Sequence, residues 1–124
     1  MSAFTKLEVA ALRSIFLELP ALAPALERQF EAAEVGEREN SGSGFFTTIE
    51  VADEVPAVIC PSVLGAETQA RISGLEHGFG FVLFIKAGKL HMLEGFSWAG
   101  ESTCDLDLTA LQFEIYKQAV QRLG

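Results

Sequence analysis

Histidine and cysteine are the residue types in this chain that could hold a metal ion or form a nucleophile and base pair. They are Cys60, His77, His91 and Cys104, and the nearest two are thirteen positions apart. Structural zinc sites usually bring their ligands in close pairs such as C-x2-C. A cysteine nucleophile needs an imidazole within hydrogen-bond reach, and no motif supplies one. We therefore expect no metal, no cofactor and no catalytic residue here, and expect Cys60 to be a small buried hydrophobe.

Carboxylates are concentrated in residues 27–54, where eight acids stand against two arginines, a net charge of −6 out of −8 for the chain. This sign of charge excludes binding through a nucleic-acid phosphate backbone. The dipole of a predicted helix disfavours Glu31 and Glu34 near its end. We interpret these acids as a surface that steers and docks a basic protein partner; the alternative is that they only keep the protein soluble. The residues of this predicted surface are Glu31, Glu34, Glu37, Glu39, Asp53 and Glu54.

A second function class remains open, a small enzyme or a ligand-binding domain with a pocket at one end of a predicted hairpin. The glycine-rich segment 74–81 leads into a strand, whereas phosphate-binding loops open a helix, so Gly80 is expected to leave room for an aromatic ring or another backbone. Glu94 falls on an otherwise apolar face and needs a partner there, such as Arg71 or an amide, or a raised pKa. The pocket residues in this alternative are Arg38, Glu76, His77, Glu94 and Trp98.

The N-terminal part of the sequence predicts two helices. The capping-box pattern T-K-L-E at residues 5–8 predicts that the first begins near residue 6, and Pro20 ends it. Apolar residues at helical spacing over residues 22–33 predict the second, with Gly36 as its left-handed terminator.

Period-two alternation predicts strands over residues 45–51 and 68–74. Two prolines bracket residues 57–60, which we assign to a short edge strand. The segment that follows residue 108 fits either a helix or a strand, and the alternation over residues 111–117 favours a strand.

The strongest local signal is an antiparallel hairpin of residues 79–86 and 89–97, turning at Ala87-Gly88 with Lys86 opposite Lys89. In that register one face carries Phe79, Phe81, Leu83, Ile85, Leu90, Met92, Glu94 and Phe96. The other face is also apolar, with Val82, Phe84, His91 and Leu93. This pattern places the hairpin in the middle of a sheet.

The chain has 124 residues, of which 49% are hydrophobic, and shows no linker or repeat. We predict one α+β domain over residues 1–124, with two N-terminal helices packed on a mostly antiparallel sheet of four to six strands. If the C-terminal segment is a strand, the second sheet face lacks a helical cover. Loops, a second copy in a homodimer, or a partner must then hide its apolar residues.

Three segments carry a resemblance to known proteins: GFFT at 44–47, HGFGFVLF at 77–84 and LEGF at 93–96. They resemble a group of small bacterial proteins and are similar to some immunity-type proteins of toxin systems. The resemblance covers about residues 38–97, and its motifs are structural. It implies an inhibitor or interaction role and no transferable active site.

The expected location is the cytoplasm, without membrane insertion. The longest wholly apolar run, residues 81–85, is far shorter than a membrane-spanning helix. The first residues lack the basic start and apolar stretch of a signal peptide, and two distant cysteines are typical of a reducing compartment.

Overall fold

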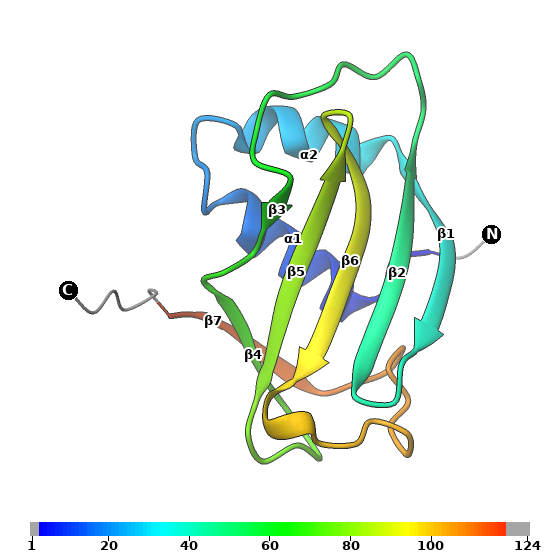
Figure 1. The fold of residues 1–124 in the computed structure, drawn as a ribbon, viewed down its shortest axis with the longest axis vertical. Helices are drawn as coiled ribbons and strands as arrows, with labels where there is room; N and C mark the ends of the chain where they lie inside the picture. Colours follow the sequence, from blue (N-terminus) through cyan, green and yellow to red (C-terminus); the bar gives the residue numbers. More distant parts are fainter. Residues whose placement is uncertain (1–2, 119–124) are drawn as a thin grey trace.

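A computed structural model describes residues 3–118, which form two helices and an antiparallel sheet of seven strands (Figure 1). The α+β class is confirmed, and the sheet has more strands than the predicted four to six. The elements are α1 (Lys6–Phe16), α2 (Ala23–Glu31), β1 (Ala33–Asn40), β2 (Gly44–Val51), β3 (Val63–Leu64), β4 (Thr68–Ile72), β5 (Phe79–Lys86), β6 (Lys89–Ser97), a 3-10 turn (Trp98–Gly100) and β7 (Phe113–Lys117).

The strand order is β1-β2-β6-β5-β4-β7, and β3 also pairs with β5. The predicted hairpin is therefore confirmed as β5 and β6 at the centre of the sheet. Lys86 lies opposite Lys89, and the turn residues Ala87 and Gly88 have φ of 52° and 76°. Positive φ at both positions is the backbone that a two-residue hairpin turn of type I′ requires. The C-terminal segment is a strand, β7, as the alternation favoured.

Helix α1 begins where the capping box predicts. The Thr5 side chain accepts from the Glu8 backbone N–H, and the Glu8 carboxylate accepts from that of Thr5. The helix ends at Phe16 rather than continuing to Pro20. Its last turn tightens because the N–H groups of residues 18 and 19 donate to carbonyls three residues back.

Two strand assignments need correction. Residues 33–40, expected to end the second helix and open a loop, form the edge strand β1, which pairs with β2 from Ala33↔Val51 to Asn40↔Phe45. Pairing with β2 overrides the weak helical pattern, and Gly36 lies in a bulge rather than at a helix end. Residues 57–60 are not a strand; β3 forms after the second proline instead.

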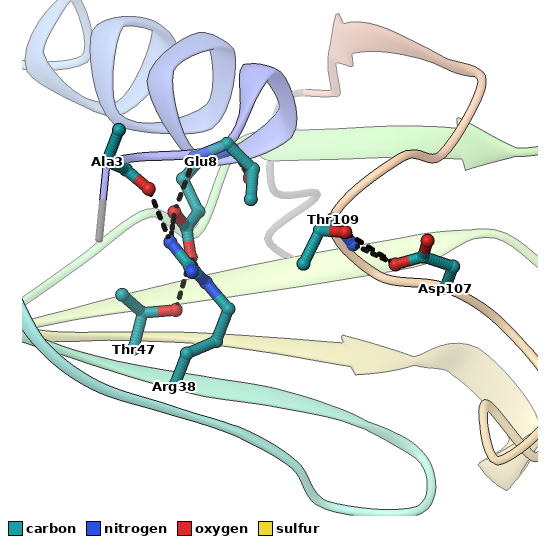
Figure 2. A network of polar contacts seen from close by, with 7 residues as sticks. Ala3, Glu8, Arg38, Thr47, Asp107 and Thr109 are labelled. Carbon is teal, nitrogen blue, oxygen red and sulfur yellow. Dashed lines mark hydrogen bonds and ion pairs between the residues drawn. The ribbon is translucent and has the colours of Figure 1, made fainter. Parts of the chain in front are cut away.

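A buried ion pair joins the first helix to the edge of the sheet (Figure 2). The Glu8 side chain is 2% exposed and accepts from the guanidinium of Arg38 on β1, with Nε at 2.8 Å, and from the hydroxyl of Thr47 on β2. Arg38 also donates to the carbonyl of Ala3, 3.0 Å away. The hydrogen bond to Glu8 is the main cause that raises the pKa of Arg38. One carboxylate thus holds α1, β1 and β2 together.

Gln29 makes the corresponding connection for the second helix. Its side chain is fully buried, and its amide donates to the carbonyls of Pro56 and Gly88 while its oxygen accepts from the backbone N–H of Leu90. A buried amide is tolerated when all its hydrogen-bond groups are satisfied. These bonds hold α2 at the β5–β6 turn.

The two faces of the hairpin differ from the prediction because of one bulge in β6. Ile85 pairs with Leu90 but Phe84 pairs with Met92, so His91 is an extra residue and every later side chain of β6 changes side. Leu93 and Gly95, not Met92, Glu94 and Phe96, therefore share the face of Phe79, Phe81, Leu83 and Ile85. That face belongs to the buried core, which also contains Leu7, Leu12, Ile15, Leu26 and Leu108.

Two glycines separate this covered face from the opposite one. A Cβ on Gly95 would lie 2.4 Å from ring atoms of both Phe45 and Phe79, which are buried. A Cβ on Gly80 would lie 2.5 Å from the ring of Phe96, which is only half-buried. Gly80 leaves room for an aromatic ring, as expected from the sequence.

We predict that Gly95→Ala lowers the free energy of unfolding by about 1–3 kcal/mol, because neither buried ring can move away. Gly80→Ala should cost less than about 1 kcal/mol, since Phe96 can rotate into solvent and alanine is the better strand residue. Urea unfolding of the two variants measures the difference. Equal losses at the two glycines would contradict the assignment of one covered and one open face.

Candidate binding surface

The side of the sheet opposite the core carries half-buried apolar side chains, and we call it the open face. In Figure 1 both helices lie behind the sheet, on the other side from this face. Cross-strand partners share a face, so the pairings of β2, β6, β5 and β3 define its members. One member, Val63, is 55% exposed. Trp98, which follows β6 directly, is 43% exposed. The apolar side chains of the open face are Phe46, Val63, Val82, Phe84, Met92 and Phe96.

Carboxylates occupy the same face around Phe46. Phe46 pairs with Glu39 on β1 and with Glu94 on β6. Glu34 pairs with Glu50 near the other end of the β1–β2 ladder. The Glu50 side chain lies over Gly36, where a Cβ would come within 2.9 Å of its carboxylate. None of these four acids belongs to an ion pair within residues 3–118. The β1–β2–β6 part of the open face is therefore acidic.

Two cations on this face lie away from these acids and already have partners, whereas Lys86, opposite Lys89 at the hairpin turn, is exposed. Lys89 at the hairpin turn donates to the carbonyls of Ala52 and Asp53 at 2.9 Å. Arg71 on β4 pairs with Glu114 on β7 and lies 4.5 Å from the ring centre of Tyr116. Charge is thus segregated along the sheet, with the acids beside β1 and the cations at the hairpin turn and beside β7.

The acids selected from the sequence are all exposed, but the structure divides them. Glu31 ends α2, Glu34, Glu37 and Glu39 lie along β1, and Asp53 and Glu54 lie in the loop after β2. Register places only Glu34 and Glu39 on the open face. Glu34 is not at a helix end, so the dipole argument applies to Glu31 alone. Glu50 and Glu94 complete the acidic group. That Glu50 belongs to it follows only from the pairing of β1 with β2, which places Glu50 opposite Glu34.

The residues of the predicted pocket lie in separate places. Arg38 is in the ion pair with Glu8, on the covered side of β1. Glu76 and His77 are exposed on the turn before β5, beside a small cavity of about 220 Å³ that Arg71 and Tyr116 also line. Trp98 lines a larger cavity next to β3. Glu94 lines neither of these cavities, and the expected contact with Arg71 does not form because Arg71 pairs with Glu114.

The cysteines and histidines lie on different elements. Cys60 is half-buried against the core, and desolvation raises the pKa of its thiol; Cys104 is exposed, and both are free thiols. Within residues 3–118, no three Cys, His, Asp or Glu side chains are grouped so as to hold a metal ion. The same part of the chain has no helix with the length and apolar character to cross a bilayer.

Comparison of the chain with protein-family models, curated proteins and solved structures found no match. Function must therefore be inferred from the geometry of this molecule.

The turn before β5 depends on a carboxylate and gives a pH prediction. Glu101 accepts from the backbone N–H groups of Glu76 and His77, at 2.9 and 2.6 Å, and these bonds lower its pKa from the ordinary 4.5. Because the folded pKa is lowered, the contribution to stability is present at neutral pH and is lost as the pH falls through that pKa. In an NMR titration, the amides of Glu76 and His77 should shift with a midpoint below 4.5.

Glu101→Gln is the control, since it removes the titrating group and should abolish this transition in both amides. A midpoint at or above the ordinary glutamate value would show that the turn does not depend on these bonds.

Proposed function

We propose that this chain is a protein-binding module that docks a basic partner on the acidic part of its open face. The observation that carries the proposal is the position of Phe46, an accessible aromatic ring flanked by Glu39 and Glu94 on the same sheet face. A few residues supply most of the binding energy of typical interfaces, aromatic side chains are common among them, and complementary charges around them select the partner. A partner with lysine or arginine next to apolar side chains matches both features.

Two further observations support this choice. Contiguous apolar groups on a monomer surface commonly mark an interaction site, and here they continue from Phe46 through Met92 and Phe84 to Val63. The acids on β1, β2 and β6 lack cationic partners within the described chain, so their charge is available to steer an oppositely charged protein.

A homodimer through this face is the less favoured arrangement. Two copies would bring the same carboxylates together around Phe46, and like charges at an interface cost several kcal/mol. The resemblance to immunity-type proteins fits a role as an inhibitor of a cationic protein. Free Cys60 and Cys104 fit action in the cytoplasm.

Site-specific cross-linking tests the proposal. A photoreactive phenylalanine analogue replaces Phe84 on the open face, or Leu17, which is 61% exposed at the end of α1, as the control. In cells that naturally make this chain, we expect the analogue at position 84, but not at 17, to yield an adduct with a protein rich in lysine and arginine. Once the partner is purified, its association rate at low salt should fall at least about tenfold in the double variant Glu39→Lys, Glu94→Lys.

Glu31→Lys is the charge control, because Glu31 is exposed, as Glu39 is, but lies at the end of α2. It should leave the association rate within about twofold of the wild type once net charge is allowed for. Equal cross-linking from position 17, an adduct that is a second copy of this chain, or no effect of the double variant would each refute docking of a basic partner on this face.

A further inference from the structure

On the side of β5 away from β6, the ladder of backbone hydrogen bonds is interrupted. Strand β3 pairs with β5 at Val63↔Phe84 and Leu64↔Leu83, and β4 pairs with it at Gln69↔Gly80 and Ala70↔Phe79. Between them residues 65–68 form a turn in which the Thr68 N–H donates to the Gly65 carbonyl at 3.1 Å. A cavity of about 440 Å³ lies beside this interruption. That volume is within the range of about 300–1,000 Å³ typical of small-molecule sites.

The walls of this cavity are mainly apolar and aromatic. Phe81, Val82, Phe96 and Trp98 contribute from β5, β6 and the turn after it. The indole of Trp98 packs edge-to-face on Phe96, with ring centres 4.9 Å apart, and its N–H donates to the Gln69 side-chain oxygen at 2.7 Å. The indole N–H already has an acceptor. A ligand would therefore contact only the apolar surface of the indole.

One polar side chain in the cavity wall has an unused hydrogen-bond donor. Gln69 is only 8% exposed and lines the cavity. Its oxygen is used by Trp98, which fixes the orientation of the amide, and its –NH₂ group donates to no residue of the described chain. Because no buried side-chain nitrogen or oxygen of the described chain lacks a hydrogen-bond partner, this –NH₂ group is an accessible donor rather than a buried one. This group can therefore donate to a ligand in the cavity, including to the face of an aromatic ring.

The charged groups in the wall are both negative. They are Glu18, from the segment after α1, and Glu67, from the turn before β4, and no basic residue of the described chain lines the cavity. Glu18 accepts from the Thr68 hydroxyl at 2.5 Å and from the Glu67 backbone N–H at 3.4 Å. These donors are neutral, and neither carboxylate forms an ion pair within residues 3–118.

We infer that this cavity binds a small organic amine with an apolar, preferably aromatic, body. Its ammonium group lies against the carboxylates of Glu18 and Glu67, its apolar body contacts Phe96 and Trp98, and the face of an aromatic ring in that body accepts from the Gln69 amide. Carboxylates supply the charge that a protonated amine requires, and aromatic faces attract cations further. This site is separate from the acidic part of the open face around Phe46, so it goes beyond the docking function proposed above.

The chain offers a direct readout, since Trp98 is its single tryptophan. Phenethylamine is the probe, and 2-phenylethanol is a neutral control of the same shape. We expect phenethylamine to change the tryptophan emission saturably at millimolar concentration, and 2-phenylethanol to bind about tenfold more weakly. NMR signals of the Gln69 side-chain amide should move with the same saturation curve.

Glu67→Gln should weaken phenethylamine binding about tenfold while leaving 2-phenylethanol unchanged, because the Glu67 side chain takes no part in the turn's hydrogen bonds. Glu76→Gln, an exposed carboxylate outside this cavity, is the matched control and should bind like the wild type. The inference is overturned if no probe alters the Trp98 emission, if the amine and the alcohol bind equally, or if Glu67→Gln has no effect.

Discussion

Burial of the Glu8 carboxylate is the constraint on which the arrangement of layers depends. A buried carboxylate is tolerated only when charge and hydrogen-bond partners surround it, and Glu8 finds them on β1 and β2, in Arg38 and Thr47. Helix α1 cannot leave this side of the sheet without exposing an unpaired Arg38 or burying an unpaired Glu8. Gln29 holds α2 to the hairpin turn in the same way, through neutral hydrogen bonds. Both helices are therefore committed to one face.

The open face follows from this commitment, because two short helices can cover only one side of a seven-stranded sheet. The acidic part of this face around Phe46 and the cavity beside β3 differ in chemistry. The first is a surface of strands with carboxylates around an aromatic ring. The second is a hollow at an interrupted ladder, with the amide of Gln69 inside it. One suits a protein partner and the other a small cation.

Local signals in the sequence predicted what local chemistry decides: the capping box of α1, strand β4 and the β5–β6 hairpin with its Lys86↔Lys89 register. Features set by tertiary pairing were missed. Strand β1 is rich in glutamate and becomes a strand only because β2 lies beside it. The bulge at His91 reverses the sides of Met92 and Glu94, and nothing in the local alternation marks that extra residue. The predicted pocket mixed residues from both faces for this reason, and the acidic group around Phe46 could not be assembled before β1 was known.

The accessibility of individual aromatic rings in solution tests the separation of the two faces most directly. A soluble paramagnetic relaxation agent, added to protein with labelled phenylalanine, should broaden the ring signals of Phe84 and Phe96 strongly. The rings of Phe79 and Phe81, which are 0% and 2% exposed, should be nearly unaffected. Equal protection of all four rings across the micromolar concentration range would mean that the open face is covered in the free protein, and would contradict the existence of an accessible docking surface.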